Sequence, residues 1–300
     1  MEHNKTTTRF IIISFLFQFT LQISSYGQDS INNKETEYTE HTFFNTRIAD
    51  IHSIETLERG VLDVRLAHRM GRISSGVSEF FGLNQASSQL GLEYGITNNL
   101  MVGVNNNTLN KLYSGFIKYK ILKQSTGKIV MPVSISWLSN TEVQTGKLNY
   151  PNDQYYFSSR LFFTHQLIIA RKFSDKFSFQ ISPTLVHKNI VETRADKNDI
   201  YLMGLATRYK IKRKIALTGE YNVIFPHQIY SNFNGSLPVN SLSIGIDIYT
   251  GKHTFQFFIT NSVAVDEKSF LTESTEKFFK KGIHFGFNIS RLFNIVNYYE

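Results

Sequence analysis

Histidine, serine and acidic side chains are the candidates for chemistry in this 300-residue chain, because it contains no cysteine. The lack of cysteine excludes thiolate metal sites, a cysteine nucleophile and a lipid-modified N-terminal cysteine. Beyond the first 27 residues eight histidines remain, at positions 41, 52, 68, 165, 187, 227, 253 and 284. None lies two or four residues from another, which is the local spacing of paired metal ligands. The sequence therefore predicts no metal and no cofactor.

His165 has the least ordinary position of the eight. It shares an alternating row with Leu161, Phe163 and Leu167, and a histidine in a lipid-facing row is costly. One alternative is a lipid hydrolase embedded in a membrane, with His165 as its base. The local sequence Thr164-His165-Gln166 lacks the His-x-Ser-Asn pattern of outer-membrane phospholipases, so an interface position, a bulge or a protein-covered face is the preferred interpretation.

Charged side chains fall on the polar row of the alternating segments, with acids and bases mixed. If these segments form the wall of a barrel, such residues can pair across its narrow lumen, which lowers the cost of removing them from water. They would either set the ion selectivity of an open channel or form a packed lumen, and the sequence leaves both open. The lumen-facing candidates are Asp63, Arg65, Glu93, Lys118, Lys120, Glu220, Asp247 and His284.

The segments that carry these residues alternate with a period of two, which is typical of strands with two different faces. In the last segment, Phe285 and Phe287 point one way while His284, Gly286 and Asn288 point the other. Twelve such segments follow Gly60, at 61–69, 89–96, 99–105, 116–122, 129–138, 159–169, 177–182, 201–209, 215–225, 241–249, 253–261 and 282–293.

The connections between these segments alternate between short and long. Short turns are expected at 97–99, 124–127, 174–176, 212–214 and 250–252. Longer links are expected at 71–88, 105–111, 140–156, 188–199, 226–240 and 262–281. This alternation is typical of membrane barrels, whose periplasmic turns are short and outer loops long. We predict an all-β fold, a transmembrane up-and-down antiparallel barrel of about 12 strands, within a range of 10 to 14.

The composition agrees with a membrane location. Charged residues make up only 19% of the chain and aromatic residues 14%. Backbone groups in lipid must be hydrogen-bonded internally, which a closed barrel achieves. We expect an outer-membrane protein that contacts lipid and lipopolysaccharide and binds no nucleic acid. A soluble, secreted β-sandwich binding protein is the alternative architecture.

The N-terminal part divides into three regions. Residues 1–27 read as a signal peptide, with Lys5 and Arg9 before an apolar run and Ser25-Tyr26-Gly27 as the cleavage site. Residues 28–41 are polar and aperiodic, and predict a disordered leader. Residues 42–59 alternate weakly and would form a cap, a plug in the lumen or an extra strand. The barrel should occupy 60–293 and a tail 294–300.

The last predicted strand carries a short pattern of its own. Gly282, Phe285 and Phe287 match the spacing of the signal that the barrel assembly machinery reads on a final strand, so we expect that machinery as a partner during biogenesis. The pattern departs from the usual one because seven residues follow Phe293.

Several longer stretches resemble the DUF5777 family of β-barrel proteins from Bacteroidetes-type bacteria. The resemblance spans about 43–293, and the stretches that carry it are HSIETLERG, LAHRMG, LGLEYGITNNLMVG, SPTLVHKN, TGKHTFQFFITNS and FGFNISRLF. It implies a membrane barrel without an established reaction. We therefore predict a non-enzymatic channel, conduit or structural envelope component, with the lipid hydrolase and the soluble binding protein as alternatives.

Overall fold

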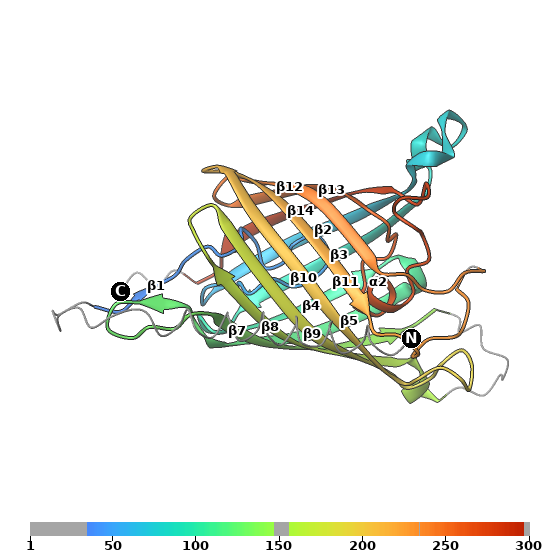
Figure 1. Ribbon diagram of the computed structural model, residues 1–300, viewed down its shortest axis with the longest axis horizontal. Coiled ribbons are helices and arrows are strands. Elements are labelled where there is room, and N and C mark those ends of the chain that lie inside the picture. The colour runs from blue at the N-terminus through green and yellow to red at the C-terminus, as the bar shows by residue number, and fades with distance from the viewer. Residues whose placement is uncertain (1–34, 147–155, 234, 297–300) are drawn as a thin grey trace, which may run out of the picture.

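The computed structural model describes residues 35–146, 156–233 and 235–296. Its main feature is one closed barrel of twelve antiparallel strands, in which the last strand pairs with the first (Figure 1). The wall strands are β2 (Val61–Arg72), β3 (Ala86–Gly95), β4 (Leu100–Asn107), β5 (Leu112–Leu122), β7 (Ser134–Gln144), β8 (Leu161–Lys172), β9 (Phe177–Lys188), β10 (Asp199–Lys212), β11 (Ile215–Ile224), β12 (Ser241–Tyr249), β13 (His253–Thr260) and β14 (His284–Asn294).

The closed sheet confirms the predicted twelve-stranded up-and-down barrel. It excludes the soluble sandwich, because a sandwich needs two packed sheets, whereas the wall here is a single sheet without free edges. Closure follows from the register of β14 on β2, in which Asn294 lies opposite Val61 and Ser290 opposite Arg65.

The two rows of each strand face different surroundings. The outward row is apolar and exposed, as at Leu90, Val104, Ile117 and Ile244. The inward row is buried and largely polar. An apolar outer belt is what lipid requires of a barrel wall, since no second protein layer covers it.

The two ends of the barrel differ. At one end lie the tight turns and a small two-stranded sheet formed by β1 (Glu37–Tyr38) and β6 (Ser125–Thr126), and at the other end lie most of the longer loops (Figure 1). Short helical turns occur in the connections at that other end, at η2 (Ile73–Ser75), η3 (Val77–Gly82), η4 (Leu109–Lys111) and η5 (Phe157–Arg160), together with the α-helix α2 (Glu267–Thr272).

Some local boundaries differ from the predicted ones. The expected turn at 124–127 is wrong, because the connection runs from Lys123 to Val133, and the strand expected at 129–138 starts too early, because β7 begins at Ser134. Pro132 has no N–H to donate to a neighbouring strand, which suits a position outside the wall. The expected long link at 105–111 is also wrong, since β4 continues to Asn107 and only four residues precede β5.

The regions outside the barrel are partly described. The predicted signal peptide, 1–27, lies outside the described residues, as do residues 28–34 of the expected disordered leader. The rest of that leader includes β1, which hydrogen-bonds to β6. β14 extends one residue past the expected barrel end at Phe293, and 297–300 lie outside the described residues. No helix in the described part of the chain is long and apolar enough to cross a membrane.

Candidate functional site

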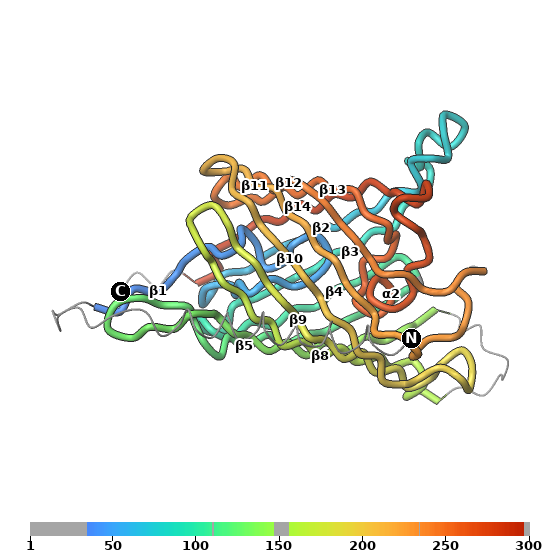
Figure 2. Tube along the Cα trace, viewed as in Figure 1, coloured from blue at the N-terminus to red at the C-terminus, as the bar shows by residue number. Residues whose placement is uncertain are grey.

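Residues 42–57, called the lumen segment below, lie inside the barrel. All but three of these sixteen residues are buried, and Arg47, Ile48, Ile51 and Ile54 are each about 1% exposed. Figure 2 shows the blue N-terminal trace passing from β1 into the outline of the barrel. The segment has almost no secondary structure beyond a single bridge between Arg47 and His52. Its backbone groups must therefore find partners among the side chains of the wall.

Wall side chains from opposite sides of the barrel donate hydrogen bonds to backbone carbonyls of the lumen segment. Lys118 Nζ donates to the carbonyls of Thr46 and Ser53, each at 3.2 Å. Gln180 Nε2 donates to His52 at 2.8 Å, and Asn288 Nδ2 donates to Ala49 at 2.8 Å. Further donors to this segment are Arg65, Arg69, Ser136 and Gln256.

Glu220 on β11 binds a bend of the lumen segment. One of its carboxylate oxygens accepts the backbone N–H groups of Ala49, Asp50 and Ile51, at 3.1, 3.1 and 3.2 Å. Successive N–H groups that converge on one oxygen form an anion-binding concavity. The bend and the wall are therefore complementary in shape and charge.

The lumen also contains an apolar cluster. This cluster was not expected, because the predicted inner row is polar. Phe43, Ile48, Ile51, Ile54 and Leu57 of the lumen segment pack together with inward-facing wall residues, which include Met101, Phe116, Leu138, Ile168, Val186 and Leu202. The β8 sequence is apolar on both of its faces because Phe162 and Ile168 lie on the interior side, while their neighbours in the strand face outward.

The loop 261–283, called the inner loop below, enters the lumen from the end opposite to the lumen segment. Its helix α2 is completely buried. Glu142 on β7 accepts the first two helical N–H groups, from Glu267 at 3.0 Å and Lys268 at 2.9 Å. Asp266 caps the helix by accepting the N–H of Ser269 at 3.0 Å. These acceptors satisfy N–H groups that every helix leaves free at its start.

The lumen segment and the inner loop meet at a buried ion pair. Arg47 Nη1 lies 2.6 Å from Glu267 Oε1, and His52 Nε2 lies 3.3 Å from the same oxygen. Asn140 Nδ2 donates to the other carboxylate oxygen at 3.1 Å. Arg47 Nε also lies 3.5 Å from Glu93, so this guanidinium joins the inner loop, the lumen segment and the wall.

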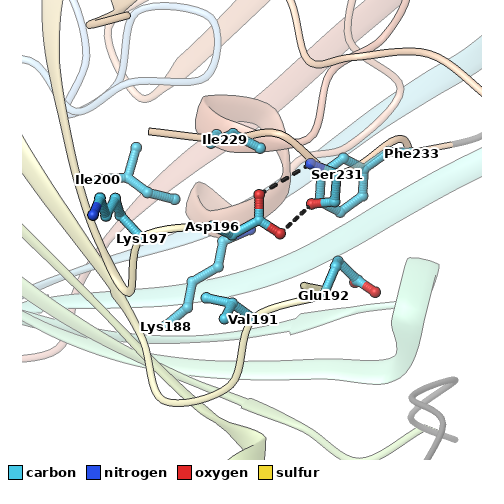
Figure 3. A pocket seen from close by; sticks show the side chains of 9 residues that line it. All are labelled: Lys188, Val191, Glu192, Asp196, Lys197, Ile200, Ile229, Ser231 and Phe233. Atoms are coloured by element: carbon cyan, nitrogen blue, oxygen red, sulfur yellow. Dashed lines mark hydrogen bonds between the residues drawn. The ribbon is translucent and has the colours of Figure 1, made fainter. Parts of the chain in front are cut away.

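At the long-loop end of the barrel, carboxylates hold the loops to one another and to the wall. Asp196 accepts hydrogen bonds from Thr193, Tyr230 and Ser231. The bonds from Ser231, drawn in Figure 3, tie the loop after β9 to the loop after β11. Burial alone would raise the pKa of Asp196, but these hydrogen bonds outweigh burial and lower it to about 2. Burial opposes ionisation of Glu273 too, yet the ammonium groups of Lys188 and Lys268 hold its pKa at about 2.

The eight lumen-facing candidates lie on the inner row, where they have two kinds of partner. Arg65, Glu93, Lys118, Lys120 and Glu220 contact the lumen segment, the Lys120 contact being a 3.9 Å ion pair with Glu55. The other three bond to the wall: Asp63 accepts from Ser290, Asp247 from Thr218 and Gln256, and His284 donates to the Met70 carbonyl.

The remaining candidates lie away from the lumen. Gly282 precedes β14, and Phe285 and Phe287 are on its outward row. His165 is on the outward face of β8, where its ring stacks on Trp137 with centroids 6.3 Å apart. Ser139 is its partner by register, but no hydrogen bond joins this pair of described side chains. Within the described ranges, no group of three or more His, Asp or Glu side chains has the arrangement of a metal site.

Arg47, Glu142 and Glu267 make the contacts that join the lumen segment, the inner loop and the wall. None of the three was among the residues predicted from the sequence. Arg47 and Glu267 belong to segments without regular alternation and lie 220 residues apart. The only local signal is Asp266, a good helix N-cap residue followed by Glu267 in the first turn.

A closed antiparallel barrel with an apolar outer belt defines a membrane-bound β-barrel protein. Proteins of this architecture reside in outer membranes. The chain belongs to the DUF5777 family, described as a membrane bound beta barrel domain, whose model matches residues 43–293. The match therefore includes the lumen segment as well as the wall.

Solved structures with a similar outline are outer-membrane proteins of low sequence identity. The NanC porin is 11% identical with a TM-score of 0.47, over 77% of this chain and 98% of the porin. An outer membrane channel from Pseudomonas putida F1 is 12% identical with a TM-score of 0.48, over 80% of this chain and 98% of the channel. A search of curated protein sequences finds no significant match.

Proposed function

We propose that this protein is a non-enzymatic conduit of the outer membrane, whose lumen is closed at rest by the lumen segment and the inner loop. The observation that carries the proposal is the way the lumen segment is held. Its polar contacts with the wall are made with side chains rather than with wall-strand backbone. Each such hydrogen bond has a small net free energy, because water replaces it when the segment leaves. The segment can therefore move without breaking the barrel.

The test is conductance in planar bilayers. The full chain should conduct little, and removal of residues 42–57 should produce a large, stable conductance. Because this deletion leaves Glu220 and Lys118 without partners, heat-modifiable electrophoretic migration must show that the barrel still folds.

A second variant tests movement without removing the lumen segment. Asn288 contacts the carbonyl of Ala49 at 2.8 Å, and the chain has no native cysteine, so cysteines at positions 49 and 288 form a specific pair. Cross-linking them with a cleavable reagent should abolish the residual conductance, and cleavage should restore it. Equal conductance before and after cross-linking would contradict a moving lumen segment.

The packed lumen also favours a second function, a permanently closed structural component of the envelope. Burial of Phe43, Ile48, Ile51 and Ile54 stabilises the closed state by roughly 1.5–3 kcal/mol for each side chain. Absence of conductance in the intact chain under every voltage and salt condition, together with a large conductance in the deletion variant, would select this function.

The hydrolase alternative rests on His165 alone. A serine nucleophile and its base need a hydrogen bond between them, and the described structure does not provide one at His165. The discriminating assay is phospholipid hydrolysis by purified protein and by His165→Ala. Activity that requires His165 would overturn the non-enzymatic proposal.

Two partners belong to the proposal as well. Lipopolysaccharide would surround the long-loop end, and the barrel assembly machinery would recognise the last strand through Gly282, Phe285 and Phe287. A Phe287→Asp variant should reach the membrane in lower amount. Phe257→Asp, opposite it on the neighbouring strand β13, places the same charge in the lipid-facing belt without altering the last strand, and it is therefore the matched control. Equal losses in both variants would contradict a recognition role.

A further inference from the structure

We propose that the vestibule at the long-loop end binds a neutral, hydroxyl-rich solute, of the class of a short oligosaccharide, and that the inner loop forms its floor. This inference rests on the proposed function, since it names the solute class that the conduit would admit. It is carried by the size of the vestibule, the residue types in its wall, the pairing of its charges and the position of α2.

The vestibule is large enough for a small oligosaccharide. It encloses about 830 Å³, within the range of ligand pockets in proteins, roughly 300–1,000 Å³. Its wall combines residues from β2, β7, β14, the loop 225–240 and the inner loop, which contributes Lys268 and Ser269 of α2. A solute that enters from the long-loop end therefore meets α2 before it meets the lumen segment.

The wall is rich in uncharged hydrogen-bonding groups. Of the nineteen described residues that line it, nine carry an amide or hydroxyl side chain, among them Gln85, Gln144, Asn232 and Ser274. Amides and hydroxyls both donate and accept, as sugar hydroxyls do. Four apolar residues complete this lining, Leu109, Phe233, Val263 and Ala264, which suit the C–H faces of a sugar ring.

The main ionised groups of the vestibule are already paired within the protein. Glu273 lies 3.1 Å from Lys268 and 2.6 Å from Lys188, and Arg72 forms an ion pair with Glu276. A charged solute would have to break one of these pairs, whereas a neutral solute would leave them intact. The pairing therefore favours a neutral ligand.

Two buried polar atoms in the wall have no protein partner among the described residues, Nε2 of His284 and Oγ of Ser269. Nδ1 of His284 donates to the Met70 carbonyl at 3.0 Å, so in the neutral ring Nε2 is an acceptor. Buried polar atoms of this kind need a hydrogen-bond partner. Both residues line the vestibule, so rotation of their side chains toward the cavity would bring these atoms to the hydroxyl groups of a solute.

The floor of the vestibule is continuous with the junction that closes the lumen. Lys268 and Ser269 directly follow Glu267, which pairs with Arg47 of the lumen segment. A solute bound to the floor would therefore lie directly beside the residues that hold α2 against the lumen segment. The same residues would thus recognise the solute and respond to it.

The proposal is tested by isothermal titration calorimetry, in which maltotriose is titrated into the full chain in detergent. Trigalacturonate and the chitosan trimer serve as acidic and basic counterparts of similar size. Maltotriose should bind more tightly than either, and Asn232→Ala and Ser269→Ala should each weaken its binding about fivefold. Asn99→Ala, at the tight turn of the opposite end, is the matched control and should leave the affinity unchanged.

Two results would overturn the inference: no binding of maltotriose by a correctly folded barrel, or tighter binding of either charged trimer. Its failure is distinguishable from failure of the conduit. Conductance of the 42–57 deletion variant without maltotriose binding refutes the vestibule alone. Maltotriose binding by a chain that never conducts, even after this deletion, refutes the conduit.

Discussion

The lumen segment and the inner loop both fill the barrel, but the wall holds them in different ways. The lumen segment has little secondary structure, so side chains from most wall strands bind its backbone groups. Part of the inner loop folds into the short helix α2, and the wall binds this loop through Asn107, Asn140 and Glu142 near the start of the helix and through Lys188 near its end. The lumen segment therefore depends on the side chains of this wall for its backbone hydrogen bonds, whereas the inner loop makes part of its own backbone hydrogen bonds within α2.

Breaking the junction between the two should have the largest effect. Arg47→Met leaves the buried Glu267 without its cation, and loss of one partner from a buried pair costs about 3–5 kcal/mol. We expect faster hydrogen exchange in both 42–57 and 261–283. The double variant Arg47→Met/Glu267→Met should regain part of that protection, because it removes the unpaired Glu267 charge, although Glu93 still loses its contact with Arg47. Effects that simply add would show that the pair does not couple the two segments.

Removal of the Glu220 carboxylate should loosen the lumen segment alone. Glu220→Ala leaves three buried N–H groups without an acceptor, at about 1 kcal/mol or more for each. Hydrogen exchange should rise in 42–57 and remain slow in 261–283. Glu220→Gln keeps an oxygen acceptor and should have a smaller effect. Equal exchange in both variants would refute the role of this oxygen.

Removal of the Glu142 carboxylate should loosen the inner loop alone. Glu142→Ala takes the acceptor from two N–H groups at the start of α2, and loss of a helix cap costs about 1–2 kcal/mol. Exchange should rise in 261–283 while 42–57 stays protected. Protection of α2 equal to that of the unaltered chain would mean that Asp266 suffices as its cap.

Acid should have the smallest effect, confined to the long-loop end. The pKa of Asp196 is lowered to about 2, so its stabilisation is complete above the unfolded value near 3.8 and is lost as the pH falls through about 2. Pepsin cleavage within 225–240 should therefore increase between pH 4 and pH 2. Asp196→Asn should be cleaved to the same extent at both values. Pepsin cleavage of the unaltered chain that does not change over this interval would contradict the assignment.

The sequence alone determined the wall. Alternation of apolar and polar residues over twelve segments specifies two faces, and a strand offers only two. The same alternation placed Glu93, Lys118 and Glu220 on the inner row without showing what they contact. It failed at 129–133, where alternating residues around Pro132 belong to a connection instead of a strand.

Only the tertiary structure decided that the lumen is filled and by what. Arg47 and Glu267 lie 220 residues apart, and neither belongs to a wall strand. Their meeting depends on barrel closure, which brings β14 beside β2 and leaves a lumen that both segments can enter. The periodicity of a strand specifies the face of each side chain. Long-range contacts inside a closed wall depend on the shape of the enclosed space, which no local pattern encodes.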